Sequence, residues 1–152
     1  MRPAVARVRP VPAPDDGARW DYVDAFELHG SPDDRTAEQW ARAALEQAPR
    51  AVRWTVLVAH RSVLRFRLGP LDGPAHVLGW RVAEQTPDRI RLEAAGPLVS
   101  AAIDGRRLSA SSLRLTTSLR YEHPVARVLW VVVGPLHRRL APLLLRRAAL
   151  RQ

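Results

Sequence analysis

Residues 112–147 read SLRLTTSLRYEHPVARVLWVVVGPLHRRLAPLLLRR, and this stretch decides the fold. Its first ten residues alternate between apolar and polar positions, which predicts a strand with one buried face. That face consists of Leu113, Leu115, Thr117, Leu119 and Tyr121. His123-Pro124 then opens a helix, because proline suits the first helical position. The C-terminal third is therefore predicted to be a strand that leads directly into a long helix.

The helix predicted from residue 125 gathers its large apolar side chains within an arc of about 120°. The arc consists of Val125, Leu129, Val132, Val133, Leu136, Leu140, Leu143 and Leu144, and Trp130 lies outside it. The opposite side holds Arg127, Arg138, Arg139 and Arg146. Because Arg147 and Arg151 return to the apolar arc, we expect the helix to fray after about residue 146. Gly134-Pro135 and Pro142 are expected to kink it.

Four segments further upstream have the two-residue period of strands. They are Trp20–Leu28, His76–Val82, Ile90–Ala94 and Val99–Ile103. The dipeptide Asp104-Gly105 after the last of these is a hairpin signal. Because consecutive strands follow one another at hairpin spacing, we expect an antiparallel sheet. With residues 113–121, the sequence predicts five strands.

Two helices are predicted between the first strand and the second. Thr36 and Gln39 have the spacing of a capping box, and Pro49 ends the helix that they open. Residues 50–68 fit two patterns, because the apolar residues from Val52 to Val63 have helical spacing while those from Leu64 to Leu68 alternate. We favour a second helix that ends at about residue 64. The overall fold class predicted is α+β.

The composition excludes several kinds of chemistry. The chain has 152 residues, the size of one domain, and it contains no cysteine. All 24 of its basic residues are arginine, which excludes a catalytic lysine. No two of the five histidines lie three to five residues apart, and no nucleotide-binding or nucleophile motif is present. We therefore expect no metal site and no cofactor.

The net charge of +9 comes entirely from the last third of the chain. Residues 1–105 carry 14 arginines and 14 acids, whereas residues 106–152 carry ten arginines and one acid, Glu122. A basic region is typical of proteins that bind nucleic acid or an anionic membrane surface. A solvated helix face is the commoner explanation, and we favour it. No nucleic-acid motif is present, so nucleic acid is an unlikely partner.

No membrane-spanning segment is predicted from the sequence. The longest uncharged runs, Ala94–Ile103 and Val128–His137, have 10 residues each, whereas a spanning helix needs about 20. The N-terminus lacks the apolar core of a signal peptide, so a cytoplasmic location is expected. The prolines of residues 1–18 predict a disordered Pro/Arg-rich tail, which leaves residues 19–152 as one domain.

The order of elements resembles the helix-grip fold of the START-like superfamily, which includes polyketide cyclase/dehydrase-like and lipid-transport proteins. The local segments that look like an uncharacterised bacterial branch are His76–Trp80, Leu115–Thr117 and Val132–Arg139. The resemblance covers residues 19–148. It implies a sheet wrapped around the C-terminal helix, a cavity between them, and a small hydrophobic molecule or lipid as ligand. The superfamily usually has six or seven strands, so a further strand is expected within residues 64–72 or from a split of residues 89–108.

Asp24 is the most unusual acid, because it shares a strand face with Tyr22 and Phe26. A carboxylate among apolar side chains could exchange protons or anchor a ligand, although pairing with an arginine or a place near the open end of the strand is the simpler explanation. The candidate ligand-binding residues are Tyr22, Asp24, Trp80, Thr117, Tyr121, Leu129 and Val133. Asp24, His76 and Tyr121 are weak candidates for catalysis, and Arg127, Arg138, Arg139 and Arg146 for an anionic partner. Plain core or solvated-surface roles remain the simpler explanation for each of them.

Three functions are compatible with these features. The first is a binding module for a small hydrophobic ligand, which the absence of a catalytic constellation favours. The second is an enzyme of the polyketide cyclase or aromatase kind, in which polar groups in the cavity act as acid and base. The third is a basic surface that binds an anionic membrane or nucleic acid. The oligomeric state is left open.

Overall fold

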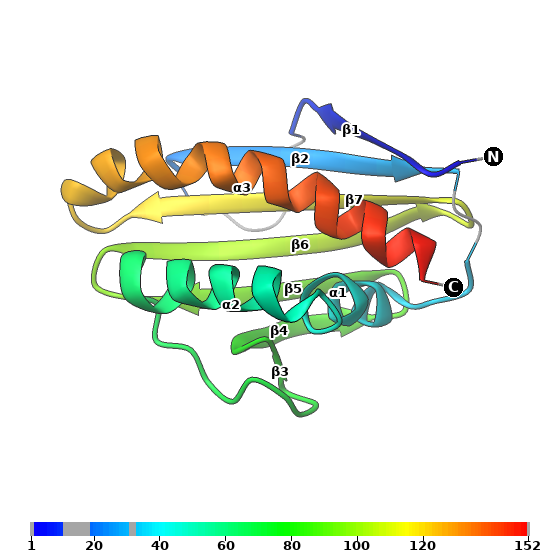
Figure 1. Cartoon of the computed structure of the whole chain (residues 1–152), viewed down its shortest axis with the longest axis horizontal. Coiled ribbons are helices and arrows are strands. Elements are labelled where there is room, and N and C mark those ends of the chain that lie inside the picture. Colours follow the sequence, from blue (N-terminus) through cyan, green and yellow to red (C-terminus); the bar gives the residue numbers. More distant parts are fainter. Residues whose placement is uncertain (1, 11–18, 31–32, 152) are drawn as a thin grey trace.

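A computed structural model describes residues 2–10, 19–30 and 33–151, and it has an α+β helix-grip architecture. Seven antiparallel strands form one sheet in the order β1-β2-β7-β6-β5-β4-β3. The strands are β1 (Ala4–Val8), β2 (Tyr22–His29), β3 (His76–Val77), β4 (Trp80–Thr86), β5 (Arg89–Ala95), β6 (Val99–Ser109) and β7 (Ser112–Tyr121). The helices are α1 (Ala37–Leu45), α2 (Arg50–Val58), the π-helix η1 (Ala59–Val63) and α3 (Val125–Leu150). Figure 1 shows the helices on one face of the sheet, with α3 crossing its β2–β7 half and α2 crossing the other half.

The two helices predicted between the first strands are confirmed. Thr36 caps α1, and both hydrogen bonds of the capping box are present between Thr36 and Gln39. Residues 50–63 are helical, so the helical pattern prevails over the alternating one there. The last turn of this segment is a π-helix, in which Leu64 N donates to Ala59 O over five residues at 2.8 Å.

The strand count of five was wrong, because two strands escaped the sequence analysis. Residues 4–8, expected in a disordered tail, form β1 and pair antiparallel with β2. The segment His76–Val82 is two strands, since Leu78 and Gly79 turn the chain back with φ values of 48° and 86°. Neither added strand lies within residues 64–72 or 89–108, where one was expected. Residues 11–18 of the predicted tail lie outside the described residues.

The hairpin predicted at Asp104-Gly105 was also wrong. Strand β6 continues through both residues to Ser109, and the turn follows at Ala110-Ser111. Gly105 faces Ile90 on the neighbouring strand, where an added Cβ would come within 3.1 Å of Ile90 Cγ2. Its small size therefore serves close packing between strands rather than a turn.

The predicted orientation of α3 was wrong as well. The residues that α3 buries are Ala126, Trp130, Gly134, Ala141, Leu144, Leu145, Ala148 and Ala149. Val125, Val132, Leu136 and Leu143 of the predicted arc are exposed, and the helix continues to Leu150 instead of fraying at residue 146. Small residues let a helix axis approach the sheet closely. At Gly134 an added Cβ would lie 2.9 Å from Nη1 of Arg138 and 3.2 Å from Nε1 of Trp130, both on α3 itself, so the glycine makes room for the tryptophan within the helix. The buried stripe thus combines small residues with Trp130 and two leucines, and most of the valines face outward.

Candidate ligand-binding cavity

A cavity of about 120 Å³ lies between the inner face of the sheet and the helices. Its sheet side is formed by apolar residues of β4–β7, among them Trp80, Leu92 and Leu119. Residues from α1, α2, η1 and α3 close it from above, and it is partly open to solvent. Thr117, His60 and His137 bring polar groups to an otherwise apolar wall. An apolar cavity with a few polar groups is the usual form of a small-molecule site.

His60 enters the cavity wall from the π-helix η1. The added residue per turn of a π-helix rotates the side chains that follow, and such turns are frequent at functional sites. The imidazole of His60 packs edge-on against Phe66 and Trp80, with ring centroids 5.7 and 5.4 Å away. Nε1 of Trp80 donates to Nδ1 of His60 at 3.2 Å. The remaining nitrogen of His60, Nε2, therefore carries the proton of the neutral ring.

The pKa of His60 is lowered from 6.5 to about 4. Burial is the main cause, and the positive charge of a protonated His137 adds to it. His60 is therefore neutral at physiological pH, and its Nε2–H can donate a hydrogen bond to an uncharged group. The two histidines, one from η1 and one from α3, line the same cavity.

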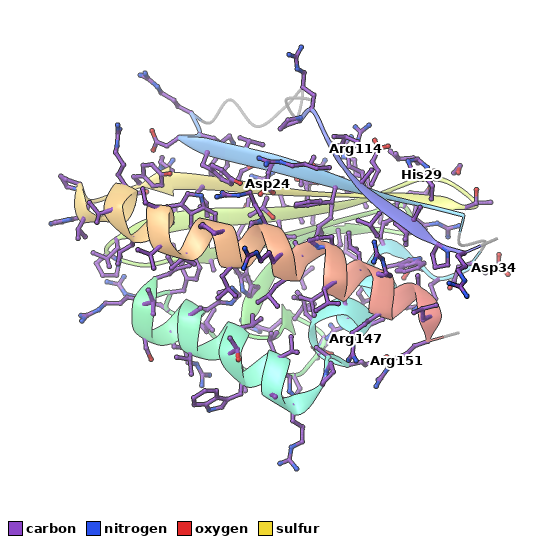
Figure 2. The ribbon with its side chains drawn as sticks, turned by 45° about the horizontal axis from the view of Figure 1, so that its top comes forward. Asp24, His29, Asp34, Arg114, Arg147 and Arg151 are labelled. Atoms are coloured by element: carbon purple, nitrogen blue, oxygen red, sulfur yellow. The ribbon has the colours of Figure 1, made fainter. Side chains whose placement is uncertain are left out.

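His137 is held by a buried carboxylate. Its Nε2 lies 3.0 Å from Oδ2 of Asp24, whose side chain is completely buried. Tyr22 Oη donates to the same carboxylate at 2.6 Å, and Nη1 of Arg138 donates to Tyr22 Oη at 3.4 Å. Figure 2 shows Asp24 on β2 beneath α3. When the His137 ring is neutral, Nε2 carries the proton, because a carboxylate only accepts hydrogen bonds, and Nδ1 is an acceptor.

Burial and its hydrogen bond to Asp24 also affect Tyr22. Burial is the largest cause that raises the pKa of the Tyr22 phenol, and the hydrogen bond to Asp24 raises it further. The phenol therefore stays protonated and keeps donating to Asp24 at neutral pH. The ring of Tyr22 packs on Trp130 at 5.0 Å, and Trp130 packs on His137 at 5.4 Å. These contacts fix the orientation of the His137 ring.

The structure brings together only part of the predicted ligand-binding set. Trp80, Thr117 and Val133 line the cavity. Asp24 and Tyr22 lie one layer behind its wall and reach it through His137. Leu129 and Tyr121 are not part of the lining, although Tyr121 packs on the edge of the core.

The three weak catalytic candidates are not brought together. His76 packs over Gly69, where an added Cβ would collide with the imidazole, and it is not part of the cavity lining. Asp24 pairs with His137 rather than with an arginine, which was the simpler expectation. Of the four arginines proposed for an anionic partner, Arg138 contacts Tyr22, and Arg127, Arg139 and Arg146 are exposed.

Two functional candidates gain their roles only in the structure. The sequence analysis passed over His60, although its spacing from Val56 places it on the buried face of the second helix. His137 was not among its candidate ligand-binding or catalytic residues, because the wrong helix face was assigned to the core. Among the described residues, no group of three or more His, Asp or Glu side chains could hold a metal ion.

Comparison with known proteins finds no matching family model, no matching curated protein and no matching solved structure. The candidate site therefore rests on its geometry alone.

Proposed function

We propose that this protein is a START-like binding module that holds a small, mostly apolar molecule in the cavity beneath α2 and α3. The observation that carries the proposal is the apolar cavity with two oriented histidines in its wall. A site of this kind gains affinity from its apolar surface and orientation from its few polar groups. The helix-grip architecture and the segments that resemble the START-like superfamily support the same function.

The chemistry of the wall narrows the class of ligand. Nε2 of His60 offers a donor and Nδ1 of His137 offers an acceptor, and neither has a protein partner among the described residues. Nε1 of Trp130, which also lines the cavity, is a buried donor without a partner in the described part of the chain. Buried donors are rarely left unpaired. A ligand with a hydroxyl or carbonyl oxygen on an apolar skeleton matches these groups.

The volume of the cavity limits the size of the part of the ligand that can be buried. An apolar cavity of about 150 Å³ holds a benzene molecule, so about 120 Å³ accommodates one ring or a short aliphatic segment. A longer ligand would extend through the open side of the cavity. The ligand class proposed is therefore an uncharged aromatic or aliphatic molecule that carries a hydroxyl or carbonyl group.

The test is mass spectrometry of the purified protein under native and then denaturing conditions, followed by titration with apolar fluorescent probes. Ala44→Phe places a ring in the cavity wall and should lower probe affinity at least tenfold. Ala51→Phe, at an exposed helical position, is the matched control and should leave affinity unchanged. Equal affinities for the two folded variants would reject the cavity as the binding site.

An acid–base enzyme is the second candidate, and the Asp24–His137 pair favours it. A carboxylate that fixes the tautomer of a histidine is a recurrent arrangement for a general base. The two functions differ in what happens to the ligand. Incubation followed by chromatography and mass analysis of the recovered ligand would return it unchanged from a binding module and converted from an enzyme. For an enzyme, Asp24→Asn should remove conversion while leaving probe binding within a few fold.

A further inference from the structure

The outward face of the helix layer exposes an unusual amount of apolar surface. On α3, Val128, Val131 and Val132 are 65%, 72% and 72% exposed. On α2, Trp54 is 68% exposed. These side chains lie on the two helices that cover the same face of the sheet (Figure 1). Several large apolar side chains exposed on one side of a molecule are typical of an interaction site.

The helices α2, η1 and α3 carry positive charge without acids. The segments 50–63 and 125–150 contain eight arginines and no aspartate or glutamate. The exposed Arg127, Arg139, Arg146 and Arg147 of α3 have no ion pair in the described part of the chain. Figure 2 shows Arg147 near the C-terminal end of α3. We call this surface, made of Trp54, Val128, Val131, Val132, Arg139, Arg146 and Arg147, the helix-side face.

By length and composition alone, α3 is apolar enough to cross a bilayer. The mean hydropathy of its most apolar 18-residue window is 1.4, and 28% of that window is buried. Its buried stripe, which includes Ala126, Trp130 and Leu145, nevertheless packs on the sheet and the other helices. The helix therefore lies along the protein surface and turns its remaining apolar side outward, as a helix in a bilayer interface does.

We propose that the helix-side face docks the protein on an anionic lipid bilayer. The valines and Trp54 enter the boundary between headgroups and acyl chains, and the arginines bind lipid phosphates. A second copy of this chain is the poorer occupant, because pairing two such faces brings arginines together with no acid between them. Nucleic acid would satisfy the arginines but leave the valines against a charged backbone. This inference does not depend on a ligand in the cavity.

Co-sedimentation with lipid vesicles tests the proposal. The full chain should bind vesicles of phosphatidylcholine with phosphatidylglycerol, and should bind phosphatidylcholine vesicles far more weakly. Added salt should weaken the binding without abolishing it, because the apolar contacts are not screened. No binding to the anionic vesicles at low salt would overturn the proposal. Retention after alkaline extraction would also overturn it, since that result indicates insertion rather than docking.

Matched variants locate the surface. Each arginine near an anionic leaflet contributes roughly fivefold in affinity, so R139Q/R146Q/R147Q should lose about 100-fold. The control R81Q/R106Q/R120Q removes the same charge from exposed arginines on the opposite side of the sheet. It should lose less than fivefold. Equal losses would show a general charge effect and would reject the helix-side face.

The apolar part has its own test. V128S/V131S/V132S should lose at least tenfold in vesicle affinity with an unchanged melting temperature, because all three side chains are already exposed. Should that variant fail to fold, vesicles with brominated acyl chains give the answer on the natural chain. They should quench Trp54 fluorescence, and Trp54→Phe should remove most of that quenching. Quenching that is unchanged by Trp54→Phe, or a dimer that the triple serine variant dissolves, would contradict bilayer docking.

Discussion

The arginines on the outer side of the sheet differ from those of the helix-side face in whether they have acidic partners. On the side of the sheet away from the helices, Arg91 lies between Glu93 and Asp104 at 3.1 and 3.0 Å, and Asp104 also accepts from Arg89 at 2.9 Å. Further along the sheet, Arg114 pairs with Glu27 at 2.6 Å. On the helix-side face the arginines stand beside exposed valines without acids. Ion pairs thus engage the arginines on the outer side of the sheet, whereas those of the helix-side face have no ion pair in the described part of the chain.

The pKa values of the paired side follow from these contacts. Burial alone would lower the pKa of the Arg91 guanidinium, but its interactions with Glu93 and Asp104 raise it overall. The hydrogen bond from Arg114 is likewise the main reason that the pKa of Glu27 is lowered. Each partner stabilises the charged form of the other, so acid and base on this side have evident structural roles. Arg139 and Arg146 on the helix-side face have no such role.

The largest expected effect is a difference in stability between variants on the two faces of α3. Leu145 is 1% exposed, and Leu145→Ala should lower the free energy of unfolding by about 2–5 kcal/mol because it leaves a cavity in the core. Val132 is on the outward side, and Val132→Ala should change stability by less than about 0.5 kcal/mol. Urea unfolding of both variants measures the difference. A larger loss in Val132→Ala than in Leu145→Ala would mean that α3 packs on the face that the sequence arc predicted.

These two positions on α3 also show where the prediction from sequence failed. The period of 3.6 residues predicted the helix correctly, but the largest apolar side chains were taken to mark its buried face. In α3 the stripe with Ala126, Gly134 and Ala141 is buried instead, because small residues allow close packing. A helix with apolar residues on most of its circumference has no unique solution from hydrophobicity alone.

Among the strands and the site residues as well, features encoded by neighbouring residues were predicted, and features that depend on distant parts of the chain were not. The capping box at Thr36 and the alternation of residues 113–121 are local, and both predictions are confirmed. Strand β1 depends on pairing with β2, and nothing in residues 4–8 alone announces it. The inward position of Asp24 was predictable from its strand period. Its partner His137 was not, because 113 residues separate the two and the predicted helix face pointed elsewhere.

The next prediction concerns the loss of stability in acid, because His60 in the cavity wall is neutral in the folded protein. The pKa of His60 is about 4 in the folded protein and 6.5 for a histidine exposed to water, as in the unfolded chain. As the pH falls, the unfolded chain therefore binds a proton at His60 before the folded protein does. Stability should therefore be complete above pH 6.5 and should decline between pH 6.5 and 4, by at most about 3 kcal/mol. His60→Gln keeps an acceptor for Trp80 and should flatten this part of the pH profile.

The comparison between wild type and His60→Gln isolates this residue from the carboxylates. Glu27 and Asp33 have lowered pKa values, so their contributions are also lost in acid, at lower pH and equally in both proteins. Urea unfolding at several pH values between 7 and 4 gives the two profiles. Parallel profiles would show that His60 is not held neutral in the fold.

The smallest effect concerns the ion pairs of the sheet side. Asp104→Asn leaves Arg89 and Arg91 without their shared carboxylate at a site where the aspartate side chain is only 13% exposed. We expect a loss of about 1–2 kcal/mol, because the hydrogen bonds to a charged group are weakened but solvent still screens the arginines. Arg139→Gln on the helix-side face removes a charge that has no partner, so its stability should equal or slightly exceed that of the wild type. Thermal unfolding at low and high salt measures both, and salt should reduce the difference between them. If Arg139→Gln were the more damaging variant, then arginine on the helix side would have a structural partner, and the contrast between the two sides would not hold.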